Sequence, residues 1–216
     1  LMKSVLIALG AFGLGLVIGI GGAFGKLYGG PVTRDLLAVY TTIVRAVPEL
    51  ILILILYFAF TSSINNLLLA WGFERIQISG FVAGIAVLGV VQGAYATEVL
   101  RGAILSVPVG QIEAARAMGM PPLLLAWRVT FPQMLAAAIP GLANLWLIAT
   151  KDTALLAVVG YAELTLVTRQ AASTSKVFFT FFMAAGMLYL AISIASTLIF
   201  GRIEAWARKG QVRTEG

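Results

Sequence analysis

Long apolar runs separated by short polar stretches dominate this chain of 216 residues. A helix needs about 20 consecutive, mostly apolar residues to cross the hydrocarbon core of a bilayer. Five runs approach or meet that length, so we expect five membrane-spanning helices, over residues 5–24, about 40–60, 80–100, about 134–148 and 177–200. The connections 61–79 and 149–176 are predicted to be partly helical and to lie on the outer side.

The first run, 5–24, follows Lys3, a pattern that it shares with secretory signal peptides. However, the run is long, and the letters GKLYGG follow it where a cleavage site with small residues would stand. We therefore expect a retained helix. Its glycines favour close packing against another helix, and they stand at positions 13, 15, 19, 21, 22 and 25.

The basic residues form two groups that alternate with the runs. Lys and Arg are enriched in cytoplasmic loops, and a majority of ten against five predicts an outer N-terminus and a cytoplasmic C-terminus. The larger group is Lys26, Arg34, Arg45, Arg101, Arg116, Arg128, Arg202, Arg208, Lys209 and Arg213, and the smaller is Lys3, Arg75, Lys151, Arg169 and Lys176.

The composition supports a polytopic membrane protein, because 60% of the residues are hydrophobic, 11% are charged and the mean hydropathy is +0.99. Cysteine and histidine are absent, which excludes disulfides, thiol nucleophiles and histidine bases, and we expect no metal site. Anionic lipid headgroups explain the net charge of +6 more simply than nucleic acid, so membrane lipid is an expected partner and nucleic acid is not.

A polar break, VGQIEAARAMGMP over residues 109–121, interrupts the apolar pattern. We expect a short cytoplasmic helix there, with Glu113 in its first turn, where the helix dipole favours negative charge. Gly119 is suited to cap its C-terminal end, and Pro121 stops its continuation. Its alanines, Ala114, Ala115 and Ala117, would let another protein surface approach closely. The alternative is a plain loop, within about 101–128, whose alanines merely tolerate water.

Ionisable residues within apolar runs are costly and point to a pathway or to an internal pair. Arg45 and Glu49 are four residues apart, so they could pair along one helix face across Pro48, which would loosen the helix. A gate or a ligand contact is the alternative. Glu98 and Arg101, three residues apart, are expected to brace the loop before the polar break.

A third group of charges, Lys151, Asp152 and Glu163, follows the fourth run, in an apolar stretch that contains Gly160. Such an interrupted segment is typical of a broken helix that lines a cavity. In a continuous helix the two carboxylates would lie about 16 Å apart on one face, and a break at Gly160 could bring them into one pocket for a cationic ligand. Alternatively, Lys151 pairs with Asp152, and Glu163 lies in an outer turn.

The sequence EAARAMGMPPLLLAWRVTFPQ resembles the EAA signature of ATP-binding-cassette importer permeases, in which Glu-Ala-Ala and Gly precede an apolar position and a final Pro at fixed spacing. The matching residues are Glu113, Ala114, Ala115, Gly119, Val129 and Pro132. The resemblance implies an all-α fold of the type I importer permeases, with one membrane domain over 1–216. It also implies that the helix carrying Glu113–Ala115, Arg116 and Gly119 couples the chain to an ATP-binding subunit.

Two further stretches, VVQGAYATEVLRGAILSVPVGQIEAA and YTTIVRAVPELILIL, resemble the polar amino-acid uptake subfamily. Ala46 stands where glycine is common in that subfamily. The stretches GAFGKLYGG and RAVPEL are most similar to the Q-type subunit of histidine/lysine/arginine/ornithine and opine importers. In related permeases for basic amino acids, acidic residues near Asp152 and Glu163 belong to the binding site, and Glu49 is a further candidate.

The chain carries no GxxxxGK[ST] phosphate-binding sequence, so an importer would need ATP and Mg bound by a separate subunit. We expect no cofactor on this chain, which would be a transport subunit and not an enzyme. The resemblance also implies a second permease subunit, identical or a sister chain, an outer amino-acid-binding protein and a location in the bacterial inner membrane.

Two other functions fit parts of the pattern. An ion- or proton-coupled carrier could use the embedded carboxylates as a proton relay, but such carriers are often built from internal repeats, and this chain has no visible repeat. An intramembrane enzyme would need a Ser/Lys or Asp/Asp arrangement, and no such motif is evident.

Overall fold

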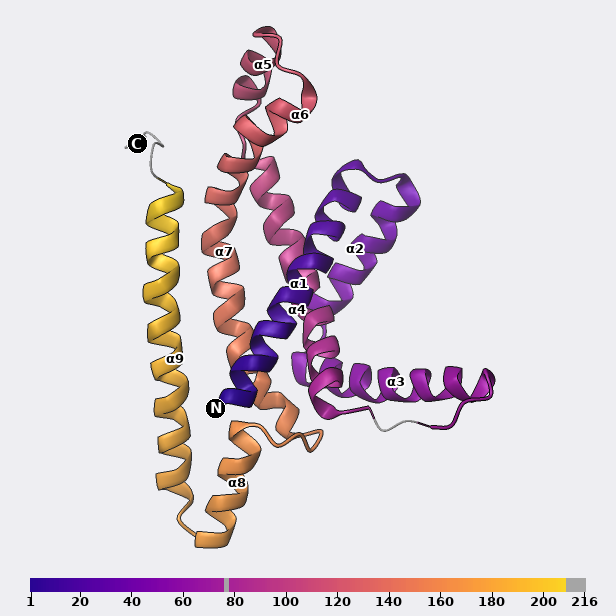
Figure 1. Ribbon diagram of the computed structural model, residues 1–216, viewed down its shortest axis with the longest axis vertical. Coiled ribbons are helices and arrows are strands. Elements are labelled where there is room, and N and C mark those ends of the chain that lie inside the picture. Colours follow the sequence, from indigo (N-terminus) through magenta and orange to yellow (C-terminus); the bar gives the residue numbers. More distant parts are fainter. Residues whose placement is uncertain (76–77, 209–216) are drawn as a thin grey trace.

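The computed structural model describes residues 1–75 and 78–208, and this part of the chain consists of helices joined by short connections (Figure 1). Five segments are long and apolar enough to cross a membrane: Met2–Tyr28, Glu49–Ala70, Gly80–Leu105, Pro122–Ala157 and Phe178–Ala207. The predicted number of spans is thus confirmed, although the bounds differ and the second span is displaced along the chain. Lys209 and Arg213, which contributed to the predicted orientation, lie outside the described residues.

The helices follow one another along the chain with two irregular turns near α7. A π-helical turn, Ala126–Thr130, leads into α7, and a 3-10 turn, Thr153–Ala157, follows it. The helices are α1 (Met2–Tyr28), α2 (Pro31–Ala46), α3 (Glu49–Ala70), α4 (Gly80–Leu105), α5 (Val109–Ala117), α6 (Pro122–Leu125), α7 (Phe131–Asp152), α8 (Leu164–Ser175) and α9 (Phe178–Ala207).

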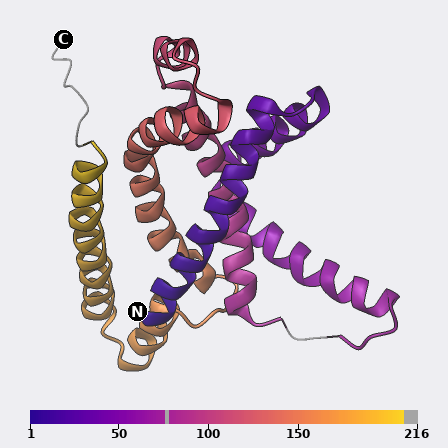
Figure 2. The same cartoon turned by 45° about the horizontal axis from the view of Figure 1, so that its top comes forward.

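Helices α1 and α4 pack together at the centre of the molecule (Figures 1 and 2). A Cβ atom added to Gly19 would lie 2.5 Å from the Cβ of Ala96, and one added to Gly15 would lie 2.9 Å from the Cβ of Gln92. Only glycine permits so close an approach of two backbones. The glycines at 22 and 25 also face close neighbours, whereas those at 13 and 21 face open space, so the predicted packing role holds for four of the six.

The second predicted span, about 40–60, is wrong as one continuous helix. α2 ends at Ala46 and α3 begins at Glu49, because Pro48 lacks an N–H and disfavours the helical conformation of Val47, which is extended. α3 then runs away from the α1–α4 pair (Figure 1). As a result Arg45 and Glu49 do not share a helix, and no ion pair joins them within the described residues.

The fourth predicted span, about 134–148, is too short. α7 runs from Phe131 to Asp152 and passes through Pro140. It ends well before Gly160, so the first break of the helix falls at Thr153 and not at Gly160 as predicted. Gly160 has a φ of +83°, and it lies in the turn that leads toward α8. Both predicted connections are partly helical as expected, since α3 continues to Ala70 and α8 lies within 149–176.

Most of the described basic residues of the two groups lie toward opposite ends of the molecule. Arg45 is an exception, since it lies in the last turn of α2, beside Tyr95 and away from the α1–α2 turn, so its predicted place with the larger group is wrong. The α1–α2 turn, α5, α6 and the end of α9 lie in the upper part of Figure 1, which we call the α5 end. The N-terminus and α8 lie in the lower part, the α8 end. Basic residues of the larger predicted group, including Arg34 and Arg116, therefore share one end, and Lys3 and Arg169 share the other.

Candidate functional site

Helix α5 is closed at its C-terminal end by a double hydrogen bond. The N–H of Gly119 donates to the carbonyl of Arg116 at 2.9 Å, and the N–H of Met120 donates to the carbonyl of Ala115 at 3.1 Å. These two bonds form a Schellman motif, which requires a left-handed residue. Gly119 supplies it with a φ of +76°, so the predicted end of this helix at Gly119 is confirmed.

The exposed face of α5 is narrower than predicted. Glu113 and Ala114 are exposed, but Ala115 is only 5% exposed, because one side of α5 is covered where it packs on the π-helical turn. The prediction that Ala115 is open to a partner is therefore wrong. Glu113 also lies in the second turn and not in the first, since α5 already begins at Val109.

A side-chain hydrogen bond connects α5 directly to α7. Nε2 of Gln133, in the first turn of α7, donates to Oε1 of Gln111 in α5 at 2.5 Å. The same nitrogen donates to the carbonyl of Val129 in the π-helical turn at 3.0 Å. The sequence pattern gave no sign of this link, because the two glutamines are far apart along the chain.

An ionic network joins α1, α2 and α4 near the start of α5. Glu98 accepts from Nζ of Lys26 at 2.5 Å and from the guanidinium of Arg101 at 2.9 Å. Lys26 also donates to the hydroxyl of Thr41 in α2 at 2.6 Å. The pairing of Glu98 with Arg101 was predicted from their spacing. The pair with Lys26 was not predicted, although the side chain of Lys26 is more deeply buried than that of Arg101.

A cluster of polar side chains lies where the break at Pro48 meets the end of α7, and in it Gln92 and Asp152 are buried while Glu49 and Tyr95 are half-buried. The carboxyl of Glu49, the first residue of α3, lies beside that of Asp152 and beside the hydroxyl of Tyr95. Nε2 of Gln92 in α4 donates to Oδ2 of Asp152 at 3.1 Å. The two breaks, at Pro48 and at Thr153, thus bring helix ends from distant parts of the chain together.

Acceptors outnumber donors in this cluster. Asp152 is 7% exposed and Gln92 is 1% exposed, and Oε1 of Gln92 is buried with no hydrogen-bond partner among the described residues. A buried polar atom without a partner is costly. Two carboxylates and this amide oxygen together can accept hydrogen bonds from an ammonium or guanidinium group.

Glu163 lies in a different environment from Asp152. Its carboxylate accepts from the N–H of Leu166 at 2.9 Å, from the hydroxyl of Tyr189 at 3.2 Å and from the hydroxyl of Ser4 at 3.4 Å. It caps α8 and connects that helix to α1 and α9. In the part of the chain that the structure describes, it shares no hydrogen-bond partner with Asp152, so the two carboxylates belong to separate hydrogen-bonded clusters.

Lys151 does not fulfil the alternative prediction of a pair with Asp152. Its side chain is exposed while that of Asp152 is buried, and the described residues contain no ion pair between them. The reason is geometric, since successive residues near the end of a helix point about 100° apart. No cluster of metal-ligating side chains occurs among the described residues.

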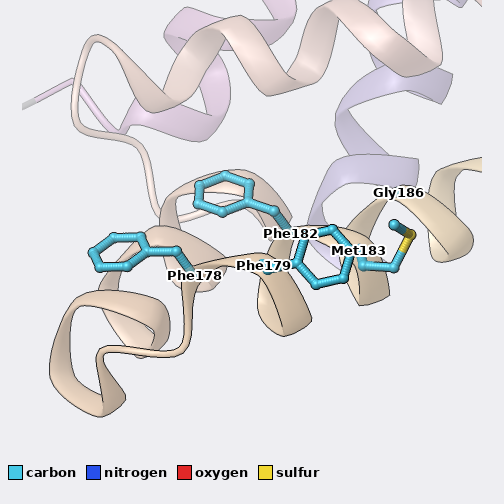
Figure 3. Close-up of a pocket in the computed structure, with 5 residues that line it drawn as sticks. All are labelled: Phe178, Phe179, Phe182, Met183 and Gly186. Carbon is cyan, nitrogen blue, oxygen red and sulfur yellow. The ribbon is translucent and has the colours of Figure 1, made fainter.

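An apolar hollow of about 410 Å³ lies at the beginning of α9 (Figure 3). It is lined by Phe178, Phe179, Phe182, Met183 and Gly186. Its lining side chains carry no nitrogen or oxygen, so it offers nothing to orient a polar substrate. We regard it as part of the apolar surface of α9 and not as a functional site.

Comparison with known proteins identifies the family. The family model described as binding-protein-dependent transport system inner membrane component matches residues 13–209. The nopaline transport system permease protein NocQ of Agrobacterium fabrum is 39% identical over 97% of this chain and 89% of its own length. The histidine/lysine/arginine/ornithine transport system permease protein HisQ of Escherichia coli is 36% identical over 88% of this chain and 83% of its own.

A solved structure supports the same assignment. The structure described as an amino acid ABC transporter with histidines superposes with a TM-score of 0.79 at 25% identity, and it covers 95% of this chain and 91% of the solved chain. The resemblance inferred from the EAA spacing is therefore confirmed over most of the chain.

Proposed function

This chain belongs to the family of binding-protein-dependent transport system inner membrane components, and we propose that it is a permease subunit through which an ATP-driven importer moves basic amino acids or opines. The names of its relatives support amino-acid or opine transport. The observation that carries the substrate class is the surplus of buried acceptors around Asp152.

The cation of the substrate binds between Asp152 and Glu49. Both carboxyl groups lie side by side, and the unpartnered oxygen of Gln92 adds a third acceptor. An ammonium or guanidinium group would supply the missing donors, and charge-assisted hydrogen bonds of this kind are about twice as strong as neutral ones. Glu163 is assigned a structural role, because its acceptors are already used.

Helix α7 carries the movement of α5 to this site. Gln133 at one end of α7 bonds to α5, and Asp152 is the last residue at the other end. Over 22 residues a helix spans about 33 Å, so α7 reaches from α5 to the acceptor cluster. When the ATP-binding subunit closes on the exposed face of α5, α7 shifts and the acceptor cluster is rearranged.

The remaining parts of the importer lie on partner subunits. ATP and Mg bind to a separate subunit at the α5 end, which is cytoplasmic, and the N-terminus lies outside. A second permease subunit completes the pathway, because five spans enclose one poorly, and a binding protein delivers substrate at the α8 end. The majority of basic residues at the α5 end supports this orientation.

Reconstitution of the importer with its partner subunits in proteoliposomes tests the proposal. We expect lysine, arginine or nopaline to stimulate ATP hydrolysis and ATP-dependent uptake, and glutamate not to. Asp152→Asn should lower uptake of the cationic substrate at least about tenfold, whereas Asp35→Asn, an exposed aspartate of α2, should not. Uptake driven by a proton gradient without ATP, or equal uptake of glutamate, would contradict the proposal.

Substitution on α5 tests the coupling separately. Ala114→Glu places a charge on the exposed face and should abolish substrate-stimulated ATP hydrolysis while the chain still folds. Ala205→Glu, an exposed alanine of α9 also at the α5 end, is the matched control. Ala115→Glu is unsuitable, because a charge on this buried residue would disturb the packing of α5 itself. Normal coupled uptake by the Ala114→Glu variant would exclude docking through this face.

A further inference from the structure

A groove of about 670 Å³ lies between α1, α5 and α7. Its walls are apolar, with Ile20 and Phe24 on α1 and Met134 and Leu142 on α7, and α5 contributes Ile112 and Arg116. We call it the α5 groove. A volume of this size is typical of ligand sites, but the groove takes no part in the acceptor cluster described above.

The depth of the α5 groove matches one leaflet of a membrane. Its α1 wall runs from Leu16 to Tyr28, and its α7 wall from Phe131 to Leu142. With a rise of 1.5 Å per residue these walls are about 18 Å and about 17 Å long. Half of the hydrocarbon core measures about 15 Å, so an acyl chain can extend along both walls.

A single positive charge stands at the end of this apolar groove. Arg116 is the one charged residue in its lining, and its side chain is exposed and forms no ion pair or hydrogen bond within the described residues. Tyr28, which is 71% exposed, lies at the end of the α1 wall. Aromatic residues of this kind are enriched at the headgroup level of membranes.

We propose that the α5 groove binds an anionic phospholipid, with an acyl chain along α1 and α7 and the phosphate on the guanidinium of Arg116. Apolar walls alone would accept any lipid. The arginine makes the site selective for an anionic headgroup, because its planar guanidinium can donate two parallel hydrogen bonds to the oxygens of one phosphate. Arg116 thus turns toward lipid, while Glu113 and Ala114 remain available to the ATP-binding subunit.

Retention of phosphatidylglycerol by the purified importer tests the headgroup contact. The assembled importer is exchanged from phosphatidylglycerol into phosphatidylcholine nanodiscs, and the phosphatidylglycerol that remains bound is counted by mass spectrometry. Arg116→Gln should lower this amount about fivefold. Arg128→Gln is the matched control, because Arg128 is also exposed and lies near α5 but does not line the groove. Equal losses in both variants, or no loss in either, would overturn the proposal.

Filling the groove tests the position of the acyl chain. Ile20 lines the groove and Val17 does not, although both are exposed on α1. Ile20→Trp should lower phosphatidylglycerol retention as strongly as Arg116→Gln, and Val17→Trp should leave it unchanged. Unchanged retention in a folded Ile20→Trp variant would overturn the proposal, and if that variant fails to assemble, the arginine pair decides alone.

Crosslinking distinguishes lipid from protein in the groove. Because the chain has no cysteine, Ile20→Cys offers one attachment point for a photoreactive maleimide on this chain. The variant chain is labelled before it is assembled with its partner subunits, so that their cysteines stay unlabelled. A crosslink to phosphatidylglycerol is the expected result. A crosslink to the ATP-binding subunit or to the second permease would overturn the proposal, since a protein surface would then occupy the groove.

Discussion

Asp152 and Glu163 are two buried carboxylates on the same stretch of chain, and the structure gives them opposite surroundings. Glu163 accepts three hydrogen bonds, from a backbone N–H and two hydroxyl groups, all supplied by fixed neighbours. Asp152 receives one from Gln92 and lies beside a second carboxyl, that of Glu49. Burial alone therefore does not distinguish a structural carboxylate from a binding one.

The distinction lies in the balance of donors and acceptors. A buried carboxylate whose hydrogen-bond donors all come from the protein is fully satisfied, and it holds together the helices that supply those donors. A group of acceptors with too few donors is incomplete, and a ligand that carries donors can complete it. By this criterion Glu163 holds α1, α8 and α9 together, and the Asp152 cluster is a candidate site for a cation.

Glu163→Ala should have the largest effect on stability. It removes the cap of α8 and leaves the hydroxyl of Ser4 without its acceptor, while that of Tyr189 keeps only Thr165 within reach. Together these losses should lower the free energy of unfolding by about 3 kcal/mol. The denaturation midpoint in detergent measures this loss. Uptake per folded molecule should stay near normal. A selective loss of uptake with unchanged stability would reverse the roles of the two carboxylates.

Glu204→Ala is the matched control for that variant. Like Glu163, Glu204 is a carboxylate with a protein partner, since it accepts a hydrogen bond from the guanidinium of Arg208 at 3.0 Å. This pair, however, lies on the surface of α9. Exposed pairs of this kind contribute at most about 1 kcal/mol. Its denaturation midpoint should therefore stay close to that of the unmodified chain.

Gln92→Met should have an intermediate effect, and it should act on transport. The change keeps the volume of the side chain but removes the donor to Asp152 and the unpartnered acceptor. A hydrogen bond to a charged group contributes about 1.5–3 kcal/mol, so we expect uptake of a basic substrate to fall about tenfold. Gln170→Met, on the exposed surface of α8, is the control. Full uptake by Gln92→Met would remove Gln92 from the site.

Tyr189→Phe should have the smallest effect. It deletes one of the three donors to Glu163 and the hydrogen bond with the Thr165 hydroxyl, while the other two donors to Glu163 remain. The free energy of unfolding should therefore fall by about 1 kcal/mol with no change in uptake. Tyr57→Phe provides the comparison, because the hydroxyl of Tyr57 donates no hydrogen bond that joins described residues. If both variants denature at the same temperature as the original chain, Tyr189 does not help to hold Glu163.

Several features followed from neighbouring residues and could be predicted. The apolar runs identify the spans, since a bilayer requires a certain length of apolar helix whatever surrounds it. Gly119 and Pro121 mark the end of α5, because a left-handed cap and a proline act on the backbone within a few residues. The same local spacing, from Glu113 to Pro132, was sufficient to identify the family.

Other features depended on contacts between distant residues. Pro48 was recognised as a weak point in the helix. Only the packing of α3 against α4 and the 3-10 turn after α7 decided that Glu49 would lie beside Asp152 and not pair with Arg45. Ala115 and Ala114 look equivalent in the sequence, but in the structure the π-helical turn covers Ala115 and leaves Ala114 exposed. A helix end is determined by its own residues, whereas the partner of a buried charge depends on which helices meet there, and only the tertiary structure settles that.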